Sequence, residues 1–288
     1  MRNLPPPVLS CNEVLISCIS NIRDQTLYTN VNSNLFSYEL AEKSYDKKGK
    51  TSKLHTIQSH RDVNGQISKN QMMFLYDKMV KKENPARDYY DELLASSRRC
   101  PFCGYGKSTT LDHFLPKSSF PIYAVTPLNL VPCCKDCNTT KLTKTTDENL
   151  LFLHPYFDNA DDSRWLYCDI GIFPETIAFR FKVVKPSIWD NEKFERMQYH
   201  FKTFNLNDLF MSFATEEFSD NLHQLKTLYA SYIENGASVS NAELAIKDDL
   251  NGKFISCQKH LINHWKTAMY DSLRNSNAFL KWIENYEY

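Results

Sequence analysis

Two pairs of cysteines, each spaced Cys-x-x-Cys, constrain this chain more than any other feature of its sequence. The first pair is Cys100 with Cys103, and the second is Cys134 with Cys137. Four thiolates in two such pairs form the tetrahedral sulfur set that Zn²⁺ favours in closed structural sites. We therefore expect a structural zinc that fixes the loop between the pairs. Cys133 competes with Cys134 as the third ligand, and the i, i+3 spacing to Cys137 favours Cys134.

Three polar residues of a reactive kind accompany the cysteines. Asp112 and His113 are adjacent between the two pairs, and Asn138 follows Cys137 directly. A carboxylate and an amide oxygen suit a hard cation such as Mg²⁺ or Mn²⁺, and an imidazole can deprotonate water near neutral pH. The pattern predicts a catalytic divalent cation on Asp112 and Asn138, with His113 as the general base. The alternatives are a core or capping histidine and an asparagine that hydrogen-bonds only to backbone.

With these residues in this order, residues 100–144 resemble the HNH endonuclease family, in the version whose ββα-metal core is clamped by two cysteine pairs. The resemblance runs through Asp112-His113, the Asn-Leu-Val that begins at Asn129, and Cys134-x-x-Cys137-Asn138-x-x-Lys141. It implies a strand, a loop, a second strand and a closing helix. It also implies hydrolysis of phosphodiester bonds, most often in DNA.

The resemblance assigns roles to two further positions. Asn129 stands at the middle position of the family pattern, which implies a structural residue whose side chain bonds to loop backbone and so aims His113. The family often has histidine at the last position, where this chain has Asn138. That departure leaves the mechanism intact and bears on the choice of metal.

The motif is locally basic, although the formal net charge of the chain is +0. Residues 98–144 contain seven Lys and Arg residues and two acids. Because phosphate contacts dominate affinity for nucleic acids, this balance indicates a modest affinity that another surface or a partner assists. The candidates for phosphate contacts are Lys117, Lys141 and Lys144. Ordinary surface charge is the alternative for each of them.

The rest of the chain is predicted to be mainly helical, so we expect an α+β protein with a central ββα-metal core. Residues 1–97 form the expected N-terminal helical region, with helices near 10–22, 31–46, 68–82 and 85–96. Residues 98–150 form the expected nuclease core. Residues 151–288 are expected to pack on that core, with strands at Trp165–Phe173 and Thr176–Val184 and then helices over 190–204, 206–234 and 241–273.

Cysteine usage and hydropathy indicate the compartment. Of the nine cysteines, four belong to the predicted zinc site and the others are scattered. Zinc thiolates together with spare thiols fit a reducing cytoplasm. The sequence contains no run of about 18 apolar residues, so we expect no membrane span.

Residues and resemblance together predict a metal-dependent DNA endonuclease. The helical extensions and neutral charge resemble effectors of bacterial anti-phage defence or restriction, including the nuclease subunit of Septu-type two-protein systems. That similarity implies a regulatory protein partner such as an ATPase. Two alternatives stay open: a zinc-stabilised nucleic-acid-binding module without activity, and an RNA-cleaving HNH toxin.

Overall fold

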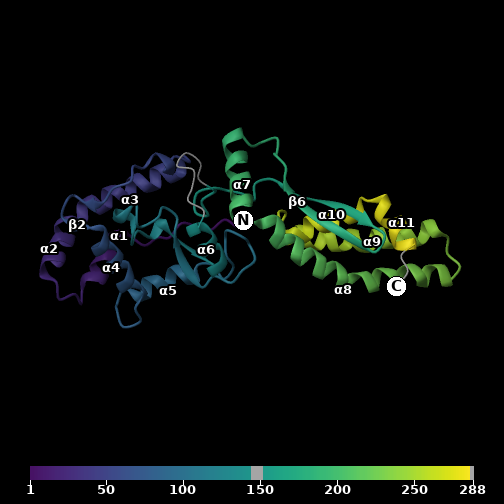
Figure 1. Ribbon diagram of the computed structural model, residues 1–288, viewed down its shortest axis with the longest axis horizontal. Helices are drawn as coiled ribbons and strands as arrows, with labels where there is room; N and C mark the ends of the chain where they lie inside the picture. Colours follow the sequence, from purple (N-terminus) through teal and green to yellow (C-terminus); the bar gives the residue numbers. More distant parts are fainter. Residues whose placement is uncertain (144–151, 286–288) are drawn as a thin grey trace. The chain divides into compact units, whose positions relative to one another are not determined.

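The computed structural model of this chain describes residues 1–143 and 152–285 (Figure 1). The chain divides into two compact units, Met1–Ala160 and Asp161–Tyr288. These boundaries differ from the three expected regions, 1–97, 98–150 and 151–288. The N-terminal helices do not form a region of their own, because they share one hydrophobic core with the segment between the cysteine pairs.

Five helices precede the first cysteine pair. They are α1 (Cys11–Ile19), α2 (Gln25–Ser33), α3 (Leu35–Lys50), α4 (Lys69–Val80) and α5 (Arg87–Ala95). Ser10 and Ser68 begin α1 and α4 with capping boxes, in which the serine and the third helical residue satisfy each other's backbone donors. The single helix expected over 31–46 is wrong. The chain breaks at Asn34, whose side chain donates to the Asn30 carbonyl at 2.8 Å.

The polar segment after α3 forms a short 3₁₀ turn and a small hairpin. The turn η1 (Leu54–Thr56) precedes β1 (Asp62–Val63), which pairs antiparallel with β2 (Ile67–Ser68). Asn64 and Gly65 have φ values of 52° and 69°. Two consecutive residues with positive φ form the tight turn that joins such strands, and Asn-Gly is the sequence best suited to it.

The segment between the cysteine pairs folds as strand, loop, strand and helix. Strand β3 (Thr110–His113) pairs antiparallel with β4 (Leu130–Cys133), so that Thr110 lies opposite Cys133 and His113 opposite Leu130. Two 3₁₀ turns, η2 (Pro121–Tyr123) and η3 (Pro127–Asn129), occupy the loop, and α6 (Lys135–Thr143) follows β4. This is the order of elements that the sequence predicted for residues 108–144, as far as the structure describes them.

One hydrophobic core holds this hairpin against the N-terminal helices. Helix α5 packs on both β3 and β4, and α1 packs on α3 and α4. The buried side chains of the cluster include Leu15, Met72, Leu93, Leu111 and Leu130. Because Leu111 is the residue before Asp112, burial of its side chain fixes the strand that carries the candidate active site.

The second unit is a two-stranded hairpin covered by helices (Figure 1). Strands β5 (Leu166–Phe173) and β6 (Thr176–Val183) pair antiparallel, with Phe173 opposite Thr176. Alternate residues of β6, namely Ile177, Phe179 and Phe181, are buried, as a strand with one covered face requires. The helices are α7 (Asn191–Thr203), α8 (Leu206–Glu234), α9 (Val239–His260), α10 (Trp265–Arg274) and α11 (Asn277–Asn285).

Helices α8 and α10 pack on the β5–β6 hairpin, and α9 packs on both helices. The single helix expected over 241–273 is wrong, because the chain turns between α9 and α10. His264 caps α10 there, with its Nδ1 accepting from the Lys266 N–H at 3.1 Å. None of the helices that the structure describes is long and apolar enough to cross a membrane.

Candidate zinc centre and active site

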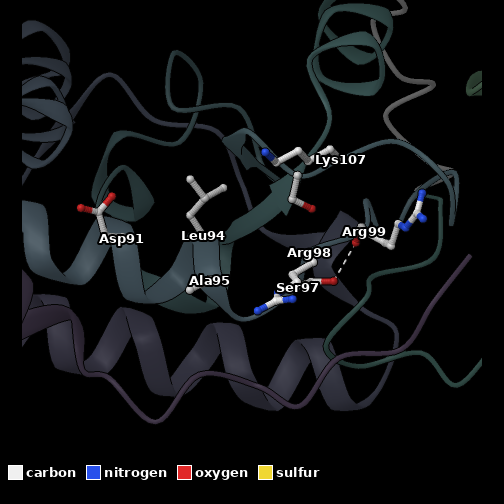
Figure 2. A pocket seen from close by; sticks show the side chains of 8 residues that line it. Asp91, Leu94, Ala95, Ser97, Arg98, Arg99 and Lys107 are labelled. Atoms are coloured by element: carbon white, nitrogen blue, oxygen red, sulfur yellow. Dashed lines mark hydrogen bonds between the residues drawn. The ribbon is translucent and has the colours of Figure 1, made fainter.

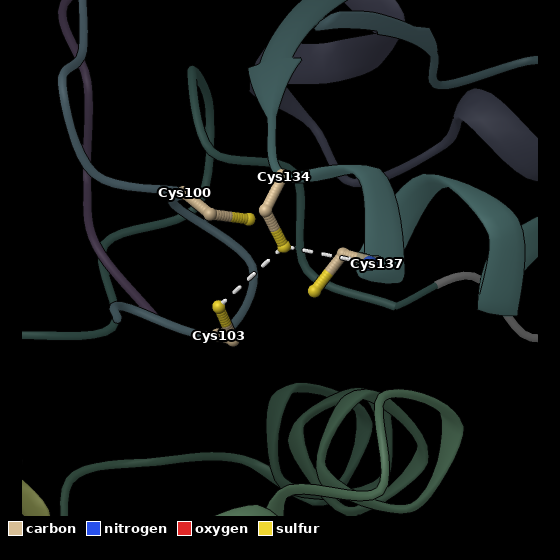
Figure 3. A group of neighbouring side chains, drawn as sticks. All are labelled: Cys100, Cys103, Cys134 and Cys137. Atoms are coloured by element: carbon tan, nitrogen blue, oxygen red, sulfur yellow. Dashed lines mark hydrogen bonds between the residues drawn. The ribbon is translucent and has the colours of Figure 1, made fainter. Parts of the chain in front are cut away.

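The four predicted zinc ligands come together in the first unit. The sulfur atoms of Cys100, Cys103, Cys134 and Cys137 all lie within 4.8 Å of one another, and all four residues are buried (Figure 3). The first pair lies on the loop before β3, while Cys134 follows β4 and Cys137 belongs to α6. The cluster therefore joins the loop before the hairpin to the helix that follows it.

Backbone geometry explains why the first pair can turn so tightly. Gly104 has a φ of +74°, a conformation that a residue with a side chain rarely adopts. A Cβ at Gly106 would lie 2.8 Å from the Cβ of Cys134, so only glycine permits this close approach. The Cys100 N–H donates to the Gly106 carbonyl at 2.7 Å, and the Gly106 N–H donates to the Cys103 sulfur at 3.3 Å. The two glycines thus let the first pair of cysteines turn back close to Cys134.

The spacing of the sulfurs fits a zinc ion. Sulfurs about 2.3 Å from a central zinc lie about 3.8 Å apart along each tetrahedral edge, and the Cys103 and Cys134 sulfurs are 4.0 Å apart. Cys133 lies outside the cluster, buried in β4 opposite Thr110. The four cysteines could therefore hold a metal ion such as zinc, and Cys134 is the third member, as the i, i+3 spacing predicted.

His113 ends β3 with its imidazole buried and its tautomer fixed. Its Nε2 lies 2.8 Å from the carbonyl oxygen of Ala124. Because a carbonyl oxygen can only accept, Nε2 carries the proton and Nδ1 carries the lone pair. The ring packs edge-on against Tyr76, with the ring centroids 4.4 Å apart. Burial first, and then the charge of Lys117, lowers the pKa of His113 to about 3, so the imidazole is neutral at pH 7.

Asp112 is buried beside it and is paired with a lysine from α6. The Lys141 ammonium lies 2.6 Å from Asp112 Oδ2, and the two side chains are 7% and 4% exposed. The same ammonium donates to the His113 carbonyl oxygen. Burial raises the pKa of Asp112 and outweighs the opposing effect of Lys141. The structure thus shows Lys141 as a buried partner of Asp112, while its predicted contact with phosphate stays a prediction.

Asn138 lies on the same face of α6 as Lys141, one turn earlier. Its amide Nδ2 lies 3.3 Å from Thr110 Oγ1. Thr110 and Asp112 are two residues apart on β3 and so point to the same face of the hairpin. The two α6 side chains therefore lie over the two β3 side chains, which brings Asn138 to the face that carries the Asp112 carboxylate.

Asn129 joins the two ends of the loop. Its Oδ1 accepts from the Leu115 N–H at 2.7 Å and from the Tyr45 hydroxyl at 2.9 Å. Its Nδ2 donates to the carbonyls of Leu115 at 3.0 Å and Tyr123 at 3.1 Å. All four hydrogen bonds of a fully buried amide are made, and three of them bind backbone of the loop that follows His113. These are the bonds expected of a residue that fixes the loop.

The structure describes one of the other two predicted lysines, Lys117. Lys117 is half-buried, with its ammonium 4.0 Å from the centroid of the Tyr76 ring, whose other neighbour is His113. Lys144 lies outside the described residues. Two residues that contact the site, Tyr45 and Tyr76, had not been predicted from the sequence. They come from α3 and α4, and no spacing in the sequence connects them with Asp112 or His113.

The fold and the site define an α+β protein in which a cluster of four cysteines joins a β-hairpin to a following helix. Over 298 aligned residues the chain is 30% identical to protein ea31 of Escherichia phage lambda, with 98% of this chain and 100% of that protein covered. The chain belongs to the family of that phage protein. No family model matches the chain, and no solved structure matches it.

Proposed function

We propose that this chain is a metal-dependent nuclease of the HNH type that hydrolyses phosphodiester bonds in DNA. The observation that carries the proposal is the arrangement at the end of β3. A buried histidine with one fixed tautomer directly follows a buried aspartate in β3, and helix α6 brings an asparagine and a lysine to the face of β3 that carries the aspartate. A scaffold that only binds zinc has no need for these polar groups, whose burial costs free energy.

His113 has the features of a general base. The hydrogen bond from Nε2 to the Ala124 carbonyl leaves the Nδ1 lone pair as the basic site, and a neutral imidazole can take a proton from water. A pKa of about 3 makes this imidazole a weak base in the free chain. A phosphate bound nearby would bring negative charge to the site, and an opposite charge raises the pKa of an imidazole.

The side chains on the face of β3 that α6 covers suit a hard cation. Asp112 offers a carboxylate and Asn138 offers an amide oxygen, which are ligands that Mg²⁺ and Mn²⁺ prefer. When bound, such an ion would stabilise negative charge on the scissile phosphate and on the leaving oxygen.

The cysteine cluster would serve to position these groups. It links the loop before β3 to the first turn of α6, and Asn138 and Lys141 lie in that helix. A zinc ion at the cluster would fix α6 over β3, so that Asn138 and Lys141 stay opposite Thr110 and Asp112. Zinc in this role is structural, since all four ligands are protein sulfurs.

Cleavage in the presence of defined metals tests the proposal. Purified chain would be incubated with supercoiled plasmid, single-stranded DNA and RNA, each with Mg²⁺, with Mn²⁺ or with no added divalent cation. We expect nicked or linear plasmid that depends on the added cation, with 5′-phosphate and 3′-hydroxyl ends. Cleavage of RNA alone would favour the RNA-cleaving alternative.

One observation favours a second candidate, a zinc-stabilised nucleic-acid-binding module without activity. The charge of Asp112 already has a buried partner in Lys141, so the site is electrostatically complete without a metal. For this candidate the expected result is DNA binding with no cleavage under any metal. Binding of Mn²⁺ to the wild-type chain and its loss in Asp112→Asn would count against it.

As a biological role, we propose an effector of anti-phage defence or restriction that works with a regulatory protein such as an ATPase. The resemblance to zinc-clamped nuclease effectors supports this role. Affinity purification of the tagged chain from its native cells provides the test. Recovery of a nucleotide-binding partner is the expected result, and a nuclease active without a partner or nucleotide would contradict the proposed regulation.

A further inference from the structure

A second cluster of charged side chains in the first unit lies outside the site described above. It lines a pocket of about 710 Å³ next to the first cysteine pair (Figure 2). The residues that matter here are Asp91, Arg98, Arg99, Lys107 and Ser108. The backbone holds its basic side together, since Arg99 and Lys107 form an antiparallel bridge and the Ser108 N–H donates to the Arg98 carbonyl at 3.1 Å.

The charge balance of this pocket suits an anion. Arg98, Arg99 and Lys107 are exposed to solvent, and within the described part of the chain no ion pair involves them. The one acid of the lining, Asp91, is already paired with Arg87, whose Nη2 lies 2.8 Å from its Oδ1. Figure 2 shows Asp91 set apart from the three basic residues. Three cations therefore line the pocket, and the lining residues include no free counter-charge.

A buried hydroxyl gives a second, independent indication of a ligand. Ser108 lines the pocket and is 8% exposed, yet its Oγ has no hydrogen-bond partner among the described residues. A buried hydroxyl without a partner costs free energy, and native structures satisfy nearly all such groups. The Oγ itself is shielded from solvent, so an acceptor oxygen placed in the pocket would supply the missing bond once the serine side chain changes its rotamer.

We infer that this pocket binds a backbone phosphate of the DNA on which the proposed nuclease acts, and the inference rests on that proposed function. Arginine forks match phosphate oxygens, and Lys and Ser add a charge and a hydroxyl donor. Arg99 is pre-organised for this role, because its Nη1 donates to the Tyr105 carbonyl at 2.8 Å and leaves its other N–H groups available. The ligand is a phosphodiester group, which the pocket would recognise by its charge and geometry and not by the neighbouring base.

The position of the pocket fits a duplex that also reaches His113. Ser108 precedes Asp112 by four residues of extended chain, which span about 13 Å at about 3.3 Å per residue. This is the maximum span, and it is shorter than the rise of about 17 Å in half a turn of B-DNA. A phosphate in the pocket and the scissile phosphate would therefore lie within the same half-turn of one duplex.

Binding to a short labelled DNA duplex without added divalent cation tests the inference apart from cleavage. The variants are Arg98→Ala/Lys107→Ala and Ser108→Ala. The matched control is Arg61→Ala/Lys69→Ala, which removes the same two charges from exposed residues that are also joined through backbone, since the Lys69 N–H donates to the Arg61 carbonyl. The dissociation constant is measured over a series of salt concentrations, and far-UV circular dichroism checks that each variant is folded.

We expect Arg98→Ala/Lys107→Ala to weaken binding about tenfold or more and to reduce the slope of log affinity against log salt by about two, one for each lost phosphate contact. Ser108→Ala should weaken binding severalfold with the slope unchanged, while the control pair stays near wild type. Equal losses in both double variants, or full affinity in Ser108→Ala, would overturn the inference. If the chain cuts DNA and the pocket variants bind and cut it as well as wild type, the inferred phosphate site is refuted and the proposed nuclease stands. If the pocket variants weaken DNA binding but the wild-type chain cuts no DNA with any metal, the proposed nuclease activity is refuted and the phosphate site stands.

Discussion

The imidazole of His113 illustrates how neighbours set the chemistry of a single residue. One ring nitrogen donates to a backbone carbonyl, Tyr76 packs against the ring, and Lys117 lies on the far side of that tyrosine. Burial and positive charge both disfavour the imidazolium, so the ring stays neutral over the physiological range. In the proposed reaction this neutral ring has a defined lone pair for a water proton.

The Asp112–Lys141 ion pair leads to a stability prediction. Lys141→Met would leave a buried carboxylate without its partner, and removal of one member of a buried pair costs about 3 kcal/mol or more. We expect a loss of that size in urea unfolding followed by far-UV circular dichroism. The exposed pair of Lys43 with Glu39 is the control, since its side chains are 68% and 44% exposed. Lys43→Met should change stability by less than about 1 kcal/mol.

A second variant separates the lost pair from lost packing. In Asp112→Asn/Lys141→Met an uncharged amide replaces the carboxylate, so a large part of the stability lost in Lys141→Met should return. If the double variant is no more stable than Lys141→Met, the ion pair does not account for the effect.

The sequence was enough to predict which residues form the site, but not which groups they contact. Asp112, His113 and Asn138 stand out because they are reactive types beside metal-ligand spacings. Lys141 was predicted to contact phosphate, and its motif gives no sign that its ammonium pairs with the buried carboxylate of Asp112. The Ala124 carbonyl and the ring of Tyr76 belong to other segments, and contacts of that kind leave no pattern in the sequence.

At the scale of elements, the site depends on how one helix lies over one strand. Asn138 and Lys141 are one turn apart on α6, and Thr110 and Asp112 are two residues apart on β3. Both spacings place side chains on a common face. The cysteine cluster fixes the start of α6 beside the loop that leads into β3, so helix and strand keep this register.

An ion-pair cluster in the second unit predicts how stability depends on pH. Asp271 on α10 pairs with Arg164, before β5, at 2.6 Å and with Arg274 at 2.7 Å. Burial alone would raise the pKa of Asp271, but hydrogen bonds from Arg274 and Arg164 lower it. A carboxyl group with a lowered folded-state pKa stabilises the fold above its unfolded pKa of about 3.9 and loses that effect as pH falls through the folded value.

We therefore expect Asp271→Asn to be less stable than wild type by about 1 kcal/mol near neutral pH. The difference should shrink below about pH 4, where the wild-type carboxyl group also becomes protonated. Urea unfolding at several pH values, followed by tryptophan fluorescence, measures it. A difference that grows as pH falls would show that the pKa of Asp271 is raised in the folded chain.

Element types were largely predictable, while helix breaks were less so. Ser10 and Ser68 mark helix starts by capping, and the alternation of apolar residues marks β6. The breaks at Asn34 and before α10 depend on hydrogen bonds of Asn34 and His264. In the sequence, those two residues look like ordinary polar positions of a longer helix. Helix α11 was not predicted.

At the scale of the whole molecule, the two units carry different chemistry. The cysteine cluster and the polar site lie in Met1–Ala160, whereas all four tryptophans of the chain lie in Asp161–Tyr288. Tryptophan fluorescence therefore reports on the second unit. The boundary between the units could not be predicted from composition, because contacts between distant segments define it and the sequence shows no linker there.

Removal of zinc should act on the first unit. A structural zinc contributes directly to folding free energy, so a strong chelator should reduce the helical circular dichroism of the chain and expose β3, β4 and α6 to hydrogen exchange. Tryptophan emission and the protection of β5 and β6 should change far less. Re-addition of zinc should restore the signal. A chain that holds no zinc after purification, or whose β3 stays protected after chelation, would contradict the proposed role of the cluster.

The most direct test of the central proposal is the ratio of DNA cleavage rates between wild type and His113→Ala, measured in a single turnover with Mg²⁺ or Mn²⁺. General-base catalysis contributes about 10²-fold or more, so we expect a loss of at least that size, with zinc content unchanged. His55→Ala, at an exposed histidine of the same unit, should cleave at the wild-type rate. Equal rates for wild type and His113→Ala would contradict the account.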